Sequence, residues 1–406
     1  MDTGNIAWML TASALVLFMV PGLAFFYAGL VRGKNVVNTI MLSFMAMAVV
    51  GVAWIVWGYS LAFGAGNEFI GNFDYIGFKD VMSDVEADSG SNSMMFAVFQ
   101  GMFAIITPAL ITGAVAERFK FKTYLVFLLI WMTVVYAPIA HWVWSDNGWI
   151  LGIGASDFAG GTVVHINAAV AAVAAAILVG KRRGIPNGIE AHNVPYVVLG
   201  AGILWFGWFG FNAGSALSAS GAAVNAFMVT NTAAAMGALT WVLLSYLTTG
   251  KASAVGAASG AVAGLVAITP AAGDVGAMGS LGIGLIAGGL TWLTVRYRHV
   301  LRIDDALDVF AIHGVGGIVG ALLTAVFATA ALQGNVGVID GEFDLLWANV
   351  RAIGATIGYS FVVTFVILKV LDLVPGLGLR ADEADEDTGL DISQHGERGY
   401  VGDGAD

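Results

Sequence analysis

Long apolar stretches alternate with short polar connections along most of the 406-residue chain. Many of these stretches exceed the roughly 18 residues that a helix needs to cross a bilayer. Hydrophobic windows predict eleven transmembrane helices, of which the Ala- and Gly-rich pair around Lys251 is the least clearly divided. The helices are predicted at about 6–30, 38–63, 94–116, 123–144, 160–180, 195–211, 224–249, 252–270, 278–297, 306–330 and 347–371. The pattern therefore predicts an all-α, multi-pass protein of the cell membrane.

The composition supports one membrane domain and leaves no room for a separate soluble core. Hydrophobic residues make up 58% of the chain and charged residues only 11%. Polar stretches longer than about a dozen residues occur only near 64–93, near 331–346 and in the tail. We expect a membrane domain over 1–371 and a cytoplasmic tail over 372–406. The chain has no cysteine, so neither a disulfide framework nor a thiolate metal site is available, and we expect no cofactor.

Basic residues are distributed very unevenly between the two sets of connections. Fifteen of the seventeen lysines and arginines fall on one set of alternate connections or near the C-terminal end, and only Lys79 and Arg351 fall on the other. The positive-inside rule then predicts that the N-terminus lies outside and the tail lies in the cytoplasm. The net charge of −11 comes largely from 64–93 and from the tail. Those acidic surfaces fit either a cation-attracting mouth or a general adaptation to salt.

Two motifs occur twice and divide the chain into halves. The tetrapeptide ITPA is found at 106–109 and at 268–271, in the third and eighth predicted helices. An aspartate followed eight residues later by a histidine is found in the fifth helix as Asp157 and His165, and in the tenth as Asp305 and His313. Repeats of five helices must run in opposite orientations. We predict two inverted five-helix repeats plus a C-terminal helix, with both histidines meeting near the midplane.

Small residues surround both histidines and favour close helix packing. An ionisable group in mid-membrane is expensive, so the default interpretation is a substrate or proton path. Two coupled imidazoles in a low dielectric cannot easily both be charged, and one shared proton could be relayed between them. The alternative is that His165 and His313 are core residues that satisfy each other's hydrogen bonds.

Further candidate residues cluster near one end of the predicted bundle. Asp157 begins its helix, where it could cap backbone N–H groups or stabilise an incoming cation through carbonyls that it orients. Phe103, Trp144 and Phe211 lie towards the outer ends of the third, fourth and sixth helices, and Ser215 follows closely. A small cation over ring faces gains about 1–2 kcal/mol when partly desolvated. Any single aromatic at this depth could instead anchor the protein in the membrane interface.

Several segments in fixed order closely resemble the ammonium transporter (Amt/Mep/Rh) family, and in particular its prokaryotic Amt branch. The resemblance covers almost the whole chain and rests on VPGLAFFYAGLVRGKN, FQGMFAIITPALITGAVAERF, DFAGGTVVHINA, WFGFNAGSA, DDALDVFAIHGVGGIVG, and GLR followed by GLDISQHGE. It implies a substrate-recruitment site at Phe103, Trp144 and Ser215, and a phenyl gate at Phe103 and Phe211. It also implies twin pore histidines at His165 and His313, with Asp157 supporting the entrance.

The same resemblance implies a function and a set of partners. Ammonium would bind at the mouth, lose its proton, and cross as ammonia through a hydrophobic pore, with methylammonium as an analogue. The protein would be a homotrimer with one pore per subunit. Its tail, which composition alone would allow to be disordered, would be ordered and meet a PII-type nitrogen regulatory protein. No enzyme activity and no nucleic-acid partner are expected.

Three other classes of function stay open from the sequence. An Rh-like protein would conduct methylammonium or carbon dioxide, although GGTVVHINA and the short N-terminal lead favour the Amt branch. An ammonium sensor would bind the ion but signal through a PII-type partner or its tail. An intramembrane enzyme would need a Ser/His pair or paired aspartates with a metal, and no such arrangement is recognisable in the sequence.

Overall fold

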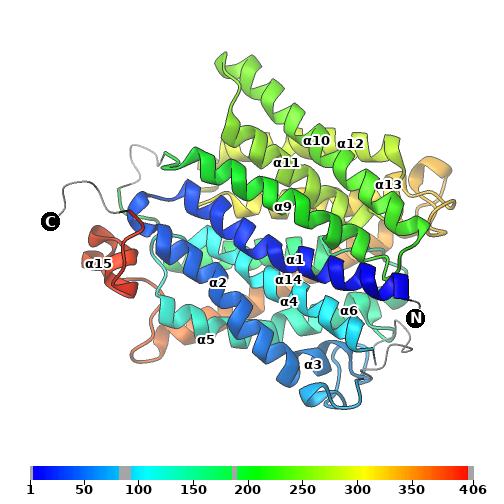
Figure 1. The fold of residues 1–406 in the computed structure, drawn as a ribbon, viewed down its shortest axis with the longest axis horizontal. Coiled ribbons are helices and arrows are strands. Elements are labelled where there is room, and N and C mark those ends of the chain that lie inside the picture. Colours follow the sequence, from blue (N-terminus) through cyan, green and yellow to red (C-terminus); the bar gives the residue numbers. More distant parts are fainter. Residues whose placement is uncertain (1–2, 82–92, 185–189, 401–406) are drawn as a thin grey trace.

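The computed structural model describes residues 3–81, 93–184 and 190–400. The helices run side by side in one bundle, and the start of α1 and the short helix α15 lie at opposite ends of it (Figure 1). We call these ends the N-terminal face and the tail face. Residues 82–92 of the acidic segment predicted at 64–93, and residues 401–406 of the tail, lie outside the described residues.

The eleven predicted membrane helices are confirmed. Within the described residues, eleven helices are long and apolar enough to cross a membrane, and the Ala- and Gly-rich pair is indeed divided on either side of Lys251. The spans are Thr3–Leu30, Gly33–Phe63, Met94–Val115, Phe121–Gly152, Gly161–Val179, Val194–Gly214, Gly221–Thr249, Ala254–Ala271, Ala277–Val300, Phe310–Phe327 and Asp344–Leu373. An odd number of spans explains why the two chain ends lie on opposite faces.

Several spans are composed of more than one helical segment. The principal α-helices are α1 (Thr3–Leu30), α2 (Val36–Ala53), α3 (Tyr59–Phe63), α4 (Met94–Val115), α5 (Phe121–Trp131), α6 (Ala137–Trp144), α7 (Trp149–Gly152), α8 (Asn167–Val179), α9 (Val194–Gly214), α10 (Gly221–Thr249), α11 (Ala254–Ile268), α12 (Ala277–Tyr297), α13 (Gly316–Phe327), α14 (Asp344–Leu373) and α15 (Glu383–Thr388). Short π-helical turns, η5 (Gly161–Ile166) and η9 (Phe310–Val315), begin the fifth and tenth spans. Such turns often mark functional positions in helices.

The two halves of the chain repeat the same packing. In the first half α1 packs on α2, α2 on α4, and α4 on α8; in the second half α9 packs on α10, α10 on α11, and α11 on α13. The leading helices of the two halves, α1 and α9, lie against each other along their length (Figure 1). Because each half has five spans, the second half runs in the opposite direction. The inverted repeat predicted from the two motifs is therefore the architecture of the bundle, and α14 packs outside it against α8 and α13.

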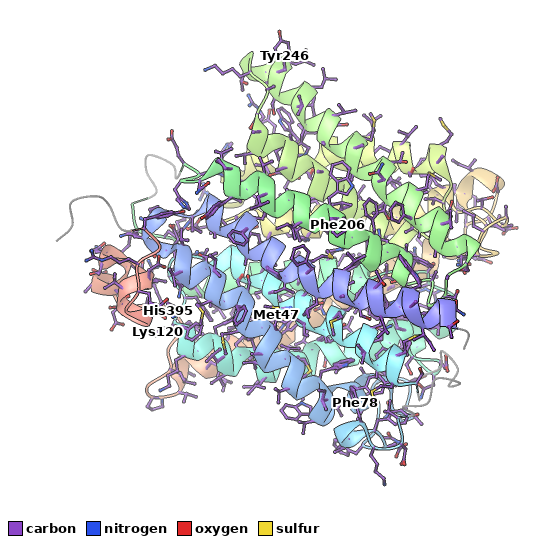
Figure 2. All side chains as sticks on the ribbon, in the orientation of Figure 1. Met47, Phe78, Lys120, Phe206, Tyr246 and His395 are labelled. Carbon is purple, nitrogen blue, oxygen red and sulfur yellow. The ribbon has the colours of Figure 1, made fainter. Side chains whose placement is uncertain are left out.

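Small residues allow the leading helices to approach closely. A Cβ atom added to Gly29 of α1 would lie 2.7 Å from Cγ2 of Val197 on α9, so no larger residue fits without a shift. Large apolar side chains instead project outward, as Phe206 and Tyr246 do in Figure 2, with 56% and 59% of their surfaces exposed. In a membrane protein such surfaces face lipid or another subunit.

The tenth helix begins later than predicted. The hydrophobic pattern placed its start at 306, whereas the span begins at Phe310. Asp308 has a backbone φ of 59°, which is incompatible with a continuous right-handed helix. The preceding residues therefore form a bend, although they are as apolar as the helix itself. The sixth helix, in contrast, extends from its predicted end at 211 to Gly214.

The tail is packed against the tail face up to Tyr400. The backbone N–H of Lys120 donates to the carbonyl of Leu379 at 2.9 Å, and that of Ala381 donates to the carbonyl of Arg118 at 2.9 Å. Beyond α15, the ring of His395 packs edge-on against Phe121, and Figure 2 shows His395 next to Lys120. Backbone pairing and ring packing together explain why this acidic segment is not a free chain end.

Candidate functional site

The fifth span begins with a carboxylate that holds four backbone N–H groups. Oδ1 of Asp157 accepts from Gly160 at 2.9 Å and Gly161 at 2.6 Å, and Oδ2 accepts from Thr162 at 2.7 Å and Val163 at 3.2 Å. Gly160 has a φ of 115°, a conformation that glycine alone adopts without strain. The predicted capping role of Asp157 thus corresponds to the geometry, since one side chain satisfies all the free donors of the first helical turn.

The tenth span begins in a similar way at the tail face. Oδ1 and Oδ2 of Asp305 accept from the backbone N–H groups of Val309 and Phe310, at 3.1 and 2.7 Å. The turns η5 and η9, which begin these two spans, each contain a buried histidine. Nδ1 of His313 lies 3.2 Å from Nδ1 of His165, and the two rings are nearly parallel with centroids 5.2 Å apart. The inverted repeat therefore brings together the two histidines that the sequence predicted to be neighbours.

A small cavity opens towards the N-terminal face. It has a volume of 110 Å³ and contains Phe103, Trp144 and Ser215, three residues that are far apart in the sequence. Its lining consists of Phe96, Gln100, Phe103, Trp144, Phe158, Ser215 and Leu217. We call it the mouth cavity. Four of these seven residues are aromatic, and Gln100 and Ser215 add polar atoms to the lining.

A series of ring contacts leads from the mouth cavity to the histidines. The ring centroid of Trp144 lies 5.6 Å from that of Phe103, which in turn lies 4.4 Å from that of Phe211. Phe211 stacks on His165 at 5.9 Å, and His165 stacks on His313. All seven residues singled out from the sequence therefore belong to one continuous structure, because Asp157 and Ser215 flank the same series.

The orientation of Trp144 is fixed by its surroundings. Its indole Nε1 donates to the backbone carbonyl of Asp157 at 2.9 Å, which links the mouth cavity to the start of the fifth span. One turn earlier, the ring nitrogens of His141 lie 2.8 Å from the carbonyl oxygen of Ala62 and 2.6 Å from that of Asn67. The buried imidazole thus ties the connection after α3 to helix α6, which carries Trp144.

A second network holds the segment that precedes Asp157. The Ser156 hydroxyl donates to Oδ2 of Asp274 at 2.7 Å, and the Ser156 N–H donates to Oδ1 of Asn349 at 2.9 Å. Asn335 also donates to Asp274, at 2.8 Å. Burial raises the pKa of the Asp274 carboxyl, while these hydrogen bonds oppose that rise. The segment before Asp157 is therefore anchored to the last span through Asn349 and to the connection between α11 and α12 through Asp274, which also holds Asn335.

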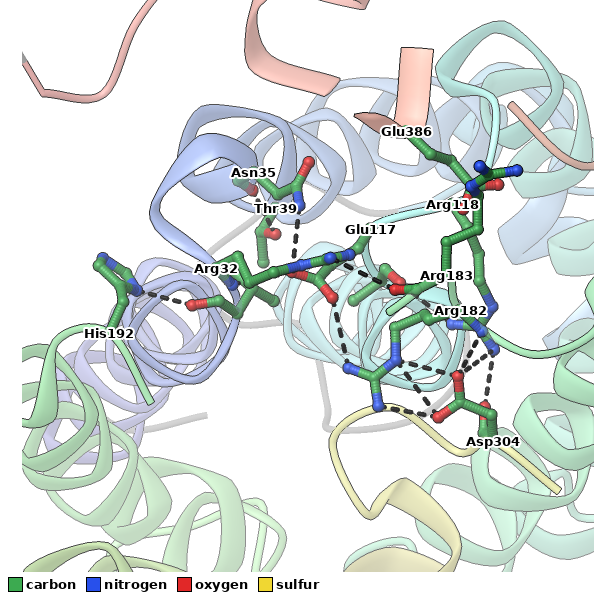
Figure 3. Close-up of polar contacts among 12 residues, drawn as sticks. Arg32, Asn35, Thr39, Glu117, Arg118, Arg182, Arg183, His192, Asp304 and Glu386 are labelled. Atoms are coloured by element: carbon green, nitrogen blue, oxygen red, sulfur yellow. Dashed lines mark hydrogen bonds and ion pairs between the residues drawn. The ribbon is translucent and has the colours of Figure 1, made fainter. Parts of the chain in front are cut away.

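The tail face has a different chemistry, dominated by buried ion pairs (Figure 3). Glu117 accepts from the Arg32 guanidinium at 2.9 Å and from Asn35 at 3.0 Å. Arg182 lies between Glu117, at 3.4 Å, and Asp304, at 2.8 Å. These residues come from both halves of the repeat and from the connection between them. The cluster thus fastens the halves together beside Asp305.

The carboxylates in this cluster are stabilised in their charged forms. Burial would raise the pKa of Asp304, but the hydrogen bonds and charge of Arg182, together with Arg118, lower it. Glu117 behaves alike, because its contacts with Arg32 and Arg182 outweigh burial and lower its pKa. Asp305 differs: burial and the nearby charge of Asp308 raise its pKa to about 7.

A larger cavity lies at the tail face, next to the cluster. Its volume is 300 Å³, and its lining is charged, with four Lys or Arg residues and two aspartates, in contrast to the aromatic mouth cavity. The lining residues are Leu30, Lys181, Arg182, Arg298, His299, Arg302, Ile303, Asp304, Asp305 and Ala306. The two cavities therefore lie at the two ends of the histidine-containing spans and differ in charge.

Five contributors to the site were not singled out from the sequence. The mouth cavity is also lined by Phe96, Gln100, Phe158 and Leu217. Trp208 stacks on His165 at 5.4 Å. Gln100 could have been found, because it lies three residues before Phe103 and therefore on the same face of the helix. Within the described residues, no group of three or more His, Cys, Asp or Glu side chains is arranged to hold a metal ion.

Comparisons with known proteins agree with this arrangement. The sequence profile of the Ammonium Transporter Family matches residues 7–400. The ammonium transporter Amt1 of Archaeoglobus fulgidus is 44% identical over 99% of this chain and 100% of its own length. An ammonium transporter of Bacillus subtilis is 45% identical over 98% of this chain and 99% of its own length. Both relatives are therefore matched from end to end.

Solved structures give the same result. The crystal structure of Saccharomyces cerevisiae Mep2 superimposes with a TM-score of 0.88 at 39% identity, covering 95% of this chain and 88% of that chain. A protein described as a sensor Amt protein superimposes with a TM-score of 0.89 at 30% identity, covering 97% and 98%. Eleven membrane helices, the matched profile and relatives of this similarity lead to one conclusion: the chain is a multi-pass membrane protein of the Ammonium Transporter Family.

Proposed function

We propose that this chain takes up ammonium at the mouth cavity, removes its proton and conducts ammonia past the paired histidines. Membership of a family of transporters, rather than of enzymes, supports ammonium transport as the general activity. The observation that carries the finer proposal is the continuous series of rings from Trp144 to His313. It gives a cation a place to bind and a neutral molecule a path to follow.

Recruitment would occur among Trp144, Phe103 and Ser215. A cation over aromatic faces gains about 1–2 kcal/mol once it is partly desolvated. The Ser215 hydroxyl donates its own proton to the carbonyl of Phe211 at 2.9 Å, so its lone pairs are left to accept an N–H bond from the ligand. Asp157 would act indirectly, by fixing the first turn of the fifth span and the carbonyl that holds Trp144.

The proton would be lost before the ligand passes the phenyl pair. Phe103 and Phe211 are buried and lie with their ring centroids 4.4 Å apart, so they form a gate that must move aside. A bare ammonium ion has no ring of charges or carbonyls there to replace its hydration, and burying an uncompensated charge is prohibitively costly. Ammonia is neutral and small, so it avoids most of that cost.

The histidine pair would then handle the proton as one unit. One hydrogen between the two Nδ1 atoms, 3.2 Å apart, leaves an Nε2 atom on each ring for other partners. Nε2 of His165 is buried and has no hydrogen-bond partner among the described residues. A proton can therefore be accepted on one ring and released from the other, while the pore stays closed to ions.

The test is to record ammonium-evoked currents on solid-supported membranes for His165→Ala, His313→Ala and the double variant. Each single variant should lose charge movement coupled to ammonium, and the double variant should be little worse than either, because the unpaired imidazole no longer relays a proton. Full currents with unchanged selectivity over potassium in both single variants would make the histidines structural and would refute the proton route.

A sensing role is the second candidate, and two observations favour it. One of the structural relatives is a sensor Amt protein, and the tail of this chain is held against the tail face by backbone and side-chain contacts. We therefore propose a PII-type nitrogen regulatory protein as a partner at that face. Uptake of radiolabelled methylammonium into vesicles, measured alongside tail-dependent binding of the partner, separates the two roles. Binding without uptake would identify a sensor.

The proposal includes orientation and assembly. The excess of basic residues on the tail face supports an extracellular N-terminal face, with 1–371 as the membrane domain and 372–406 as a cytoplasmic regulatory tail. The pore elements belong to one chain, which leaves outer helix faces free for subunit contact in a homotrimer. Native mass spectrometry gives the subunit number. Ammonium density on the trimer axis, rather than within each subunit, would contradict one pore per chain.

A further inference from the structure

The mouth cavity contains an amide group that the mechanism above does not use. Gln100 lies on α4 between Phe96 and Phe103, at the spacing that brings all three to one face of the helix. Only 8% of its surface is exposed, and its Oε1 atom is buried without a hydrogen-bond partner among the described residues. Leaving a buried acceptor unsatisfied costs about 1–3 kcal/mol, so such a group calls for an explanation.

The polar atoms of the mouth cavity are not balanced between donors and acceptors. The indole N–H of Trp144 is committed to the carbonyl of Asp157, and the hydroxyl proton of Ser215 is committed to the carbonyl of Phe211. The other lining side chains, apart from Gln100, are apolar. The cavity therefore offers a ligand two acceptors, the lone pairs of Ser215 and the carbonyl of Gln100, beside the amide N–H groups of Gln100 itself.

A ligand that fits such a cavity is compact, positively charged and rich in N–H donors. We propose that Gln100 is a further specificity-determining residue, whose carbonyl oxygen accepts a second N–H bond from ammonium beside the one accepted by Ser215. The terminal torsion of glutamine is broad and nearly two-fold, so its carbonyl turns towards the cavity at little cost. This inference rests on the proposed uptake of ammonium at the mouth.

Two acceptors and two ring faces match the four N–H bonds of ammonium. Potassium has no N–H bond to direct at either acceptor, and it needs a full ring of oxygens to replace its water shell. Methylammonium has three N–H bonds and a methyl group, which must lie against an aromatic wall. The second acceptor therefore favours ammonium over both competitors, whereas the ring faces attract any small cation.

The test compares Gln100→Met, which keeps the length of the side chain but removes the acceptor, with the wild-type chain. Concentration dependence of ammonium-evoked current gives the apparent affinity, and methylammonium and potassium are measured in parallel. Removing one hydrogen bond to a charged ligand should weaken the apparent affinity for ammonium by about tenfold or more. The affinity for methylammonium should fall less, and the maximal ammonium current should change little.

Two further variants keep the result interpretable. Gln100→Glu restores an acceptor and adds charge, so it should bind ammonium at least as tightly as the wild type and discriminate less against potassium. Thr232→Val, a polar-to-apolar change at a partly exposed position on α10, is the control for substitution itself. Elution as a single folded species and protein amount are matched for all variants. If Gln100→Met does not fold, the Gln100→Glu result decides.

The outcomes separate this inference from the function on which it rests. No ammonium current from the wild-type chain would refute the proposed function itself. A wild-type current, together with unchanged affinity and selectivity in Gln100→Met, would overturn the role of Gln100 and leave the function standing. Gln100→Glu with wild-type affinity and wild-type potassium discrimination would overturn it as well.

Discussion

The fifth and tenth spans, which carry the histidines, begin in the same way but in different surroundings. Asp157 accepts four backbone N–H bonds and lies next to aromatic rings at the mouth cavity. Asp305, its counterpart in the inverted repeat, accepts two and borders a cavity lined by basic residues and buried ion pairs. The shared part is what helix geometry demands, namely an acceptor for the free N–H groups of the first turn.

The surroundings of the two caps differ in charge, which makes the two ends of the pore unequal. One end offers π faces and lone pairs, which attract a cation, and the other offers fixed positive charges, which repel one. The proposed conduction of neutral ammonia would tolerate such an asymmetry, because a neutral molecule is neither attracted nor repelled strongly by either end. We infer that the repeat supplies the scaffold, while the side chains that diverged between its halves distinguish entry from exit.

The strongest way to break the comparison is to remove each cap. Asp157→Ala leaves four N–H groups without their acceptor and should lower the free energy of unfolding by about 4 kcal/mol, whereas Asp305→Ala should cost about 2 kcal/mol. Denaturant unfolding in detergent, followed by tryptophan fluorescence, measures both. Equal losses would show that the number of accepted bonds does not set the difference.

The ion-pair cluster at the tail face gives the next effect. Arg182→Ala leaves Glu117 and Asp304 with fewer partners while they stay buried, and should destabilise the fold by about 2–3 kcal/mol. Arg183→Ala is the matched control, since Arg183 pairs with exposed Glu383 and Asp387 and should cost less than about 1 kcal/mol. The same unfolding assay compares them, and similar losses would mean that burial of the pair is unimportant.

The pH dependence of stability sharpens the contrast at Asp305. Because its pKa is raised to about 7, the folded state holds a proton that the unfolded state has already released at pH 5. This group should therefore reduce stability by about 2 kcal/mol as the pH rises from 5 to 7. Asp305→Asn should remove that part of the slope. An unchanged slope in the variant would assign the titration to another group.

The smallest expected effect tests the mouth. Trp144→Leu should weaken the apparent affinity for ammonium by about 5- to 30-fold, which corresponds to the loss of about 1–2 kcal/mol of cation–π attraction. Stability should fall by less, because Trp144 is only partly buried. Transport at matched protein level measures the affinity. If it stays the same, Trp144 serves as a membrane-interface anchor instead of a binding residue.

Much of the fold followed from the sequence because lipid simplifies the problem. A span must satisfy its own backbone, so apolar length predicted all eleven helices, and the Asp-to-His spacing predicted that His165 would meet His313. Helix ends were less predictable. Asp308 bends the chain through its backbone conformation, and hydropathy carries no information about φ.

The sequence predicted those site residues whose residue type and spacing indicate a role. It could not predict residues whose role depends on which side chains surround them in the folded chain. Nothing about Gln100 in the sequence says that its neighbours would leave its carbonyl oxygen without a donor, since the neighbours outside its own helix come from three other segments. The ion-pair cluster of Arg32, Glu117, Arg182 and Asp304 was likewise not predictable from the sequence. In the sequence these residues lie in polar connections, where charged side chains are normally solvated, and they become buried partners only in the folded chain.

The odd number of spans in each half also constrains how such a chain arises and enters a membrane. Two copies of one five-span unit must insert in opposite directions, yet loop charge sets direction during insertion. In this chain the basic residues occupy different loops in the two halves. The connection over 116–120 contains Arg118 and Lys120, whereas its counterpart over 272–276 has no basic residue; between 298 and 309 lie Arg298 and Arg302, whereas 153–160 has none. An ancestral unit would have needed to insert either way, and the divergence of these loops fixed one direction for each copy.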